Sequence, residues 1–238
     1  MKSFLAAYDK FLERRSVDLR EDTRANFKEI LLITNGSREA LASIVTARDP
    51  SHLIDSAIYL MRSLKLRSFA PLLFDAMVDP TYNDSQRHQA ALALGFIGDY
   101  ATGIRLRSML RSKGDPKTEV FALYASSLMP GHRMDETIIR TFIDTSRDES
   151  VRAAAARAIN DAVLREALPY VRNCLIDAKG DLRLACVQAT GDIGTGDDLD
   201  LLARIMAETE SSDSEDLREA LELSIEAVLR RASRRARE

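Results

Sequence analysis

Arginine side chains recur at nearly constant intervals between residues 107 and 204 of the chain. The four members of the series are 33, 32 and 32 residues apart, namely Arg107, Arg140, Arg172 and Arg204. Arg105 and Arg111 add charge beside the first member. The planar guanidinium binds carboxylates and phosphates through two parallel hydrogen bonds. The series therefore predicts a partner-binding surface that recognises an acidic molecule.

Two kinds of acidic partner fit such a surface, and a third explanation needs no partner. An acidic segment of another protein is the leading interpretation, and a nucleic-acid backbone is the alternative. Lys and Arg total 34 against 37 Asp and Glu, so the net charge of −3 gives no support for general nucleic-acid binding. In the third explanation, the arginines are solvated and paired with neighbouring carboxylates.

Side chains that could carry out catalysis are not grouped in this sequence. The three histidines, His52, His88 and His132, are 36 and 44 residues apart, whereas zinc ligands come in closely spaced pairs. No phosphate-binding glycine loop and no nucleophile motif is recognisable. Cys174 and Cys186 fall on the apolar sides of expected helices and are interpreted as buried free thiols. We predict no catalytic residue, no metal site and no cofactor, and hence a protein that is not an enzyme.

Three segments share a pattern that must position the arginines. Residues 84–99, 148–159 and 181–194 each open with Asp, reach Arg within four residues and continue into an Ala-rich apolar stretch. A short break and a second apolar stretch follow each one. Internal repeats of this kind indicate stacked helix pairs, because one pair cannot bury its apolar face alone.

These segments resemble the HEAT-repeat family, specifically the short bacterial, PBS-lyase-type helical repeats. The resemblance implies an all-α fold, an α-α superhelix (a HEAT-like solenoid) of about six to seven helix pairs. It also implies that the second helix of each pair, which carries the arginine series, lines a concave surface. The function it implies is a non-enzymatic scaffold or adaptor that binds other proteins. A catalytic accessory similar to a lyase or glycosylase is a less favoured alternative.

A second arginine series lies early in the first helices and has a structural interpretation. Its members are Arg87, Arg152 and Arg183. The resemblance implies that each pairs with an aspartate in the turn between repeats. The aspartates available for this are Asp84, Asp148 and Asp181.

The apolar periodicity predicts helices along the whole chain, which we interpret as a single domain over residues 1–238. The expected helices are an N-terminal cap within 1–20, pairs at 22–34 with 37–47, 51–64 with 67–78, 85–97 with 101–112, 116–128 with 134–146, 149–163 with 165–177 and 181–193 with 197–209, and a capping helix with a basic tail over 214–238. No apolar run approaches the roughly 18 residues that span a bilayer. We therefore expect a cytoplasmic protein with no membrane partner.

Overall fold

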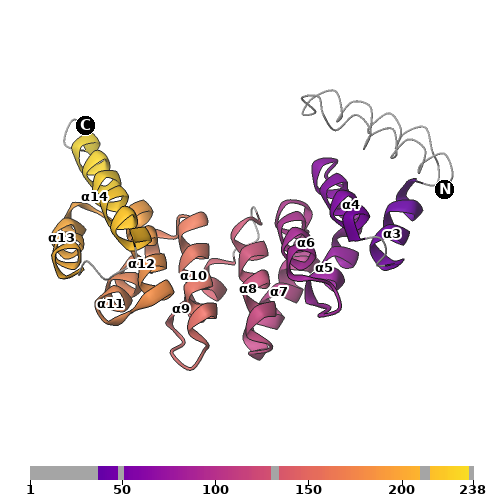
Figure 1. Cartoon of the computed structure of the whole chain (residues 1–238), viewed down its shortest axis with the longest axis horizontal. Coiled ribbons are helices and arrows are strands. Elements are labelled where there is room, and N and C mark those ends of the chain that lie inside the picture. The colour runs from indigo at the N-terminus through magenta and orange to yellow at the C-terminus, as the bar shows by residue number, and fades with distance from the viewer. Residues whose placement is uncertain (1–36, 48–50, 130–133, 210–214, 236–238) are drawn as a thin grey trace. The chain divides into compact units, whose positions relative to one another are not determined.

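The computed structural model describes residues 37–47, 51–129, 134–209 and 215–235 (Figure 1). These residues form twelve α-helices, α3 to α14, together with three short 3₁₀ turns, and they contain no β-strand. The all-α fold expected from the sequence is confirmed. The expected cap helix within residues 1–20 and the expected helix over 22–34 lie outside the described residues.

The contacts within the chain divide it into two compact units, residues 1–102 and residues 103–238. The described helices of the first unit are α3 (Ser37–Ala47), α4 (Ser51–Ser63), α5 (Ala70–Val78), which follows the 3₁₀ turn η1 (Arg67–Phe69), and α6 (Asp84–Ile97). Helix α4 packs against α3 and α6, and α5 packs against α6. The expected single domain over the whole chain stays a prediction.

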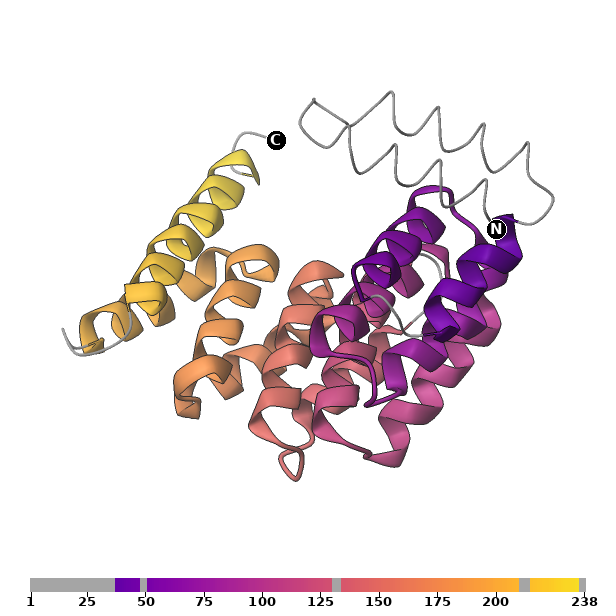
Figure 2. The ribbon, with the colours of Figure 1, turned by 45° about the vertical axis from the view of Figure 1, so that its right-hand side comes forward.

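The second unit contains two layers of helices. Its elements are most of α7 (Tyr100–Ser112), then α8 (Pro116–Ser127), α9 (Asp135–Ile143), α10 (Glu149–Asp161), η2 (Arg165–Ala167), α11 (Leu168–Asp177), α12 (Gly180–Ile193), η3 (Gly196–Asp198), α13 (Leu199–Glu208) and α14 (Glu215–Arg235). In one layer α10 packs between α8 and α12, and α12 packs between α10 and α14 (Figure 2). In the other layer α9, α11 and α13 each pack against the first-layer helix that follows them in the chain.

Small residues allow the first-layer helices to approach closely. A Cβ atom added at Gly191 of α12 would lie 2.6 Å from the hydroxyl of Ser224 and 3.1 Å from its Cα on α14. Glycine is therefore required at this contact, where two backbones meet. The Ser224 hydroxyl is buried and donates to the Val187 carbonyl at 3.0 Å. Helix α14 thus corresponds to the helix expected over 214–238, and its role as a cap for the whole array stays a prediction.

One expected helix is shorter in the structure than in the sequence interpretation. The helix expected over 134–146 ends at Ile143. The next residue, Asp144, has an extended backbone, and its carboxylate accepts hydrogen bonds from the Ser146 hydroxyl at 2.6 Å and the Ser146 amide at 3.2 Å. This side-chain bonding stabilises a turn in place of a further helical turn.

Two of the first-helix arginines, Arg87 and Arg152, bond to backbone carbonyls, which supports their structural interpretation. The Nε of Arg87 donates to the Met77 carbonyl at 2.8 Å, and that of Arg152 donates to the Phe142 carbonyl at 3.1 Å. Each carbonyl lies in the last turn of the preceding helix, α5 for Arg87 and α9 for Arg152, where backbone acceptors lack helical donors. Asp148, the partner expected for Arg152, instead caps α10 by accepting from the Ser150 amide at 2.8 Å.

The third member of that series also departs from expectation. Asp181, the partner expected for Arg183, forms an ion pair with Arg157 on α10. The Nε of Arg183 is buried and has no hydrogen-bond partner among the described residues. The three arginines therefore share a position in the repeat, but the Nε of Arg183 does not make the hydrogen bond to a backbone carbonyl that Arg87 and Arg152 make.

Candidate functional site

The second-layer helices α9, α11 and α13 carry three of the four predicted arginines between buried apolar positions. On α13, Leu202 and Ile205 are buried and Arg204 between them is exposed. The same spacing on α9 leaves Arg140 exposed. The helical period of 3.6 residues thus directs these two guanidinium groups away from the core.

Arg172 on α11 has a buried carboxylate partner within the protein, Asp198. Its guanidinium forms a bidentate pair with Asp198, in which Nη2 donates to Oδ2 at 2.9 Å and Nε donates to Oδ1. Nη2 also donates to the Thr195 hydroxyl at 3.3 Å. The Asp198 side chain is 1% exposed, whereas that of Arg172 is 35% exposed. Most of the charge of Arg172 is therefore compensated inside the protein.

The protonation of this pair follows from its burial and its hydrogen bonds. Burial acts to raise the pKa of the Asp198 carboxyl, but the hydrogen bonds from Arg172 and from the Thr195 amide at 2.7 Å outweigh it. The pKa of Asp198 is consequently lower than its ordinary value, and the hydrogen bond to Asp198 raises the pKa of Arg172. Both groups are charged at neutral pH.

Arg140 and Arg204 lie in a different environment. Arg140 pairs with Glu136 one turn earlier on α9 at 2.6 Å, and the two side chains are 69% and 71% exposed. Arg204 is exposed and forms no ion pair with any other residue that the structure describes. These two guanidinium groups remain accessible to a partner because their contacts within the protein are solvated or absent in the described part.

The remaining predicted arginines lie on α7. Arg105 and Arg111 are exposed. Arg107 is partly buried, and its Nη1 lies 3.9 Å from the sulfur of Met134. The structure thus places Arg107 and Arg172 partly inside the protein and the other four predicted site residues at its surface.

Sequence reasoning missed a buried arginine in the turn after α9. The side chain of Arg147 is 7% exposed and pairs with the carboxylate of Glu119 on α8, which is 4% exposed. Its Nη2 donates to the Leu110 carbonyl at the end of α7. Its Nε lies 3.4 Å from Asp144 Oδ2, which is ion-pair distance but lacks hydrogen-bond geometry. This arginine joins α7, α8 and the turn, and no spacing rule distinguished it from its neighbours.

Lys113 extends the same charged turn to the surface. Its ammonium lies 2.7 Å from Asp144 Oδ2 and donates to the Ser146 hydroxyl at 2.7 Å. These hydrogen bonds, first from Lys113 and then from Ser146, hold the pKa of the Asp144 carboxyl far below its usual range. The turn is therefore fixed by charges that are present at any physiological pH.

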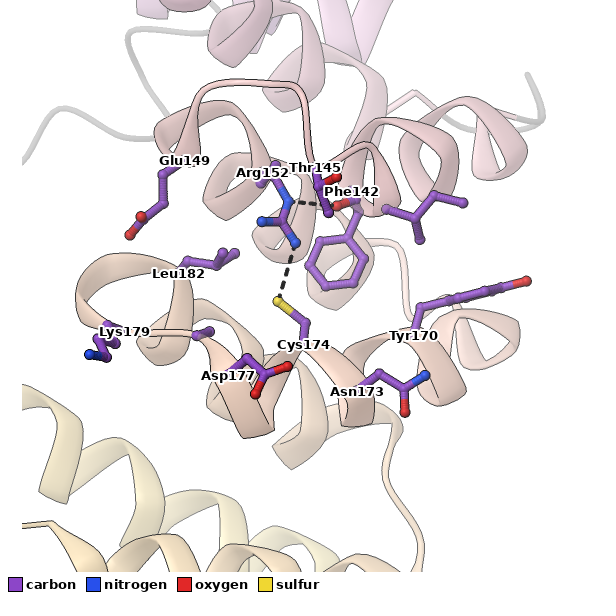
Figure 3. A pocket seen from close by; sticks show the side chains of 12 residues that line it. Phe142, Thr145, Glu149, Arg152, Tyr170, Asn173, Cys174, Asp177, Lys179 and Leu182 are labelled. Atoms are coloured by element: carbon purple, nitrogen blue, oxygen red, sulfur yellow. Dashed lines mark hydrogen bonds between the residues drawn. The ribbon is translucent and has the colours of Figure 1, made fainter.

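A pocket of about 500 Å³ lies among α9, α10, α11 and α12 (Figure 3). Phe142, Tyr170 and Leu182 supply its apolar wall, and Arg152 and Lys179 supply positive charge. The volume lies in the range of small-ligand sites, which are about 300–1,000 Å³. Tyr170 is exposed at the edge of this pocket.

One of the two cysteines of the chain, Cys174, lines this pocket. The sulfur of Cys174 lines it and lies 3.6 Å from Nη2 of Arg152, a contact drawn as a dashed line in Figure 3. The interaction with Cys186 and the charge of Arg152 lower the pKa of the Cys174 thiol to about 7. Cys186 is fully buried as expected, but Cys174 is only partly buried. The sequence placed each thiol on an apolar helix face but did not indicate the contact between Cys174 and Arg152.

A smaller exposed cluster occurs in the first unit. The guanidinium of Arg62 lies 5.3 Å from the ring centre of Tyr59 and 5.8 Å from that of Phe96, and both rings are about half exposed. Such cation–π contacts are commonest with arginine. Tyr, Phe and Arg are enriched at protein interfaces, but the sequence gave no periodic signal for this cluster.

Metal sites and membrane-spanning helices are absent from the part of the chain that the structure describes. No three His, Cys, Asp or Glu side chains of these residues come together as metal ligands. Of the three histidines, His132 lies outside the described residues, and burial lowers the pKa of His88. Among the described helices, none is long and apolar enough to cross a membrane.

Comparison with known proteins identifies the repeats in the second unit. The family profile of HEAT repeats matches residues 139–233, a range that contains Arg140, Arg172 and Arg204. No curated protein matches the chain.

Proposed function

We propose that the chain is a protein-binding scaffold or adaptor, because residues 139–233 match the profile of HEAT repeats, which typically bind other proteins. Its partner is an acidic segment of another protein. The observation that carries the proposal is the pair of accessible guanidinium groups, Arg140 and Arg204, at equivalent positions of second-layer helices. HEAT repeats are typically non-catalytic, and we propose that this chain is no exception.

The predicted arginines divide into two roles in this proposal. Arg140 and Arg204 contact carboxylates of the partner, and Arg105 and Arg111 on α7 extend the positive surface. Arg172 acts mainly as a positioning residue, because Asp198 already holds its guanidinium in a bidentate pair. Arg107, which is partly buried, contributes charge from below the surface. An extended acidic peptide suits this arrangement, since repeats present successive binding positions along one surface.

Charge reversal with a matched control tests the proposal. The variant carries Arg140→Glu and Arg204→Glu, and the control carries Arg218→Glu and Arg234→Glu, two exposed arginines of α14. Each double substitution changes the net charge by the same amount, and circular dichroism verifies equal helicity. Proteins from nuclease-treated host lysate are captured on each form at physiological salt.

The expected result is a protein retained by the native chain and the control but lost from the Arg140/Arg204 variant. Binding of that protein should weaken as salt is raised, because exposed charges are screened over about 8 Å at physiological ionic strength. Equal capture by all three forms would refute the arginine surface. Capture that disappears on nuclease treatment alone would identify nucleic acid as the partner in place of protein.

A further inference from the structure

Arg152 is a cation without a carboxylate partner in the part of the chain that the structure describes. Its Nε donates to the Phe142 carbonyl at 3.1 Å, and its Nη2 lies 3.6 Å from the Cys174 sulfur. The other arginine of α10 differs, because Arg157 forms an ion pair with Asp181. Charged groups that are withdrawn from water are normally paired. The partly buried guanidinium of Arg152 is therefore available to an anion from outside the chain.

The guanidinium of Arg152 lines the pocket of about 500 Å³, and residues of α9, α10, α11 and α12 form the other walls (Figure 3). Helix α9 packs on α10, α11 packs on α12, and α10 and α12 pack against each other. These contacts hold the walls in place without a ligand. The pocket is therefore preformed, as small-ligand sites usually are.

The other charged groups of the pocket leave the charge of Arg152 uncompensated. Glu149 and Asp177 line the pocket and are exposed, and neither forms an ion pair with Arg152. In Figure 3 the Glu149 carboxylate points away from the guanidinium. Lys179 adds a second exposed cation. The Cys174 thiol, whose pKa is about 7, is about half ionised at neutral pH and balances the charge of Arg152 only in part.

An apolar wall lies beside this cation. The side chains of Phe142 and Leu182 line the pocket and are almost fully buried elsewhere, whereas Ile143 and Tyr170 are exposed at its edge. An apolar group that enters the pocket is removed from water by these four side chains, which is favourable. One cation next to an apolar wall therefore selects a ligand that combines an anionic group with an apolar body.

We propose that this pocket binds a small carboxylic acid with an aromatic or branched apolar body, whose carboxylate pairs with Arg152. The carboxylate accepts hydrogen bonds from the guanidinium, of which Nη1 makes no hydrogen bond to any residue that the structure describes. A monoanion suits the pocket better than a phosphate dianion, because Glu149 and Asp177 repel a second negative charge. This inference is independent of the arginine surface proposed above, since neither Arg140 nor Arg204 lines the pocket.

Saturation-transfer NMR on the full chain tests the proposal, with phenylacetate as the probe. Phenylacetamide keeps the ring and loses the charge, acetate keeps the charge and loses the ring, and inorganic phosphate supplies the dianion. Phenylacetate should bind at least about tenfold more tightly than each of the three, because charge-assisted hydrogen bonds and apolar burial both contribute. Equal binding of phenylacetate and phenylacetamide would overturn the proposal, as would the absence of phenylacetate binding at millimolar concentration.

Two pairs of variants locate the site. Arg152→Gln removes the charge but keeps an N–H that can reach the Phe142 carbonyl, and Arg157→Gln on the same helix is its control outside the pocket. Tyr170→Ala shortens the exposed edge of the wall, and Ile176→Ala, exposed on α11 outside the pocket, is its control. Arg152→Gln should weaken phenylacetate binding at least about tenfold and leave phenylacetamide binding unchanged. Tyr170→Ala should weaken both, and the two controls should change neither.

Alkylation of Cys174 provides a second readout in the native chain, because its sulfur lines the pocket beside Arg152. Phenylacetate should slow the reaction of Cys174 with iodoacetamide in proportion to its occupancy, whereas phenylacetamide at the same concentration should not. Full reactivity of Cys174 at phenylacetate concentrations that saturate the NMR signal would place the ligand elsewhere and refute the site. Unchanged phenylacetate binding in both Arg152→Gln and Tyr170→Ala, with folding verified by urea unfolding, would refute it as well.

Discussion

Arg140 and Arg147 lie on either side of the end of α9 and have opposite surroundings. Arg140 points to solvent and pairs with Glu136, and both side chains are about 70% exposed. Arg147 is almost fully buried and contacts the carboxylate of Glu119 and the carbonyl of Leu110. The difference teaches that an arginine becomes structural when buried acceptors converge on it, whatever its place in a periodic series.

The two periodic series support the same lesson. Arg87 and Arg152 each donate to a carbonyl in the last turn of the helix that precedes their own. In the other series Arg172 has a buried bidentate carboxylate partner, whereas the partner of Arg140 is solvated. A constant spacing therefore places side chains at equivalent positions of successive helices, but the acceptors on neighbouring elements decide whether they hold the fold or remain available for binding.

Removal of Arg147 should produce the largest change in stability of the substitutions considered. Arg147→Ala leaves the carboxylate of Glu119 buried without its cation, a situation that costs about 3–5 kcal/mol. Urea unfolding followed by circular dichroism measures the loss. Arg111→Ala, which removes an exposed arginine of α7, is the matched control and should change stability by about 0.5 kcal/mol or less.

A double substitution sharpens the same prediction. Arg147→Met combined with Glu119→Leu removes both charges and fills the space with apolar groups, so it should be less destabilising than Arg147→Ala alone. A loss below about 1 kcal/mol for the single variant would show that the buried pair does not form.

The Arg172–Asp198 pair should give an intermediate effect that depends on pH. Asp198→Asn removes the charge that Arg172 binds in a bidentate manner, and hydrogen bonds to charged groups contribute about 1.5–3 kcal/mol. The native pKa of Asp198 is depressed from 3.8, so the unfolded chain takes up the proton at higher pH. The stabilisation is complete above the unfolded pKa and is lost as the pH falls through the native pKa.

Urea unfolding of the native chain and the Asp198→Asn variant, at neutral pH and at about pH 3, tests this prediction. The difference in unfolding free energy between the two proteins should be largest at neutral pH and should shrink on acidification. A difference that is constant with pH would show that the charge of Asp198 does not stabilise the fold.

Local sequence signals predicted the helices well, because each helix carries its own apolar period and its own ends. Asp115 and Asp148 mark the starts of α8 and α10 and accept hydrogen bonds from amides of the first turns. The exception is α9, where Asp144 bonds to Ser146 and ends the helix early. Helix formation depends on residues within a few positions, which a single sequence displays.

The site was less predictable, because its contacts join residues far apart in the sequence. The periodicity located Arg172 on its helix, but its partner Asp198 lies 26 residues away, in the 3₁₀ turn η3 that follows α12. The Thr195-x-x-Asp198 capping pattern was the available signal for that carboxylate. Arg152 of α10 contacts Cys174 of α11, 22 residues away, and no local pattern reports which residues of two packed helices touch.

Arg140→Ala should produce the smallest change in stability, although Arg140 is central to the proposed binding surface. Its ion pair with Glu136 is solvated, and such pairs within a helix contribute about 0.3–0.5 kcal/mol. A double-mutant cycle with Glu136→Ala, measured by urea unfolding at low and high salt, isolates the pair, and its coupling energy should fall as salt is raised. A coupling above about 1 kcal/mol would place Arg140 with the structural arginines such as Arg147. A small coupling energy between Arg140 and Glu136, together with loss of partner capture by the Arg140/Arg204 variant, would assign Arg140 to binding. Its charge would then stabilise the complex with the partner and contribute little to folding.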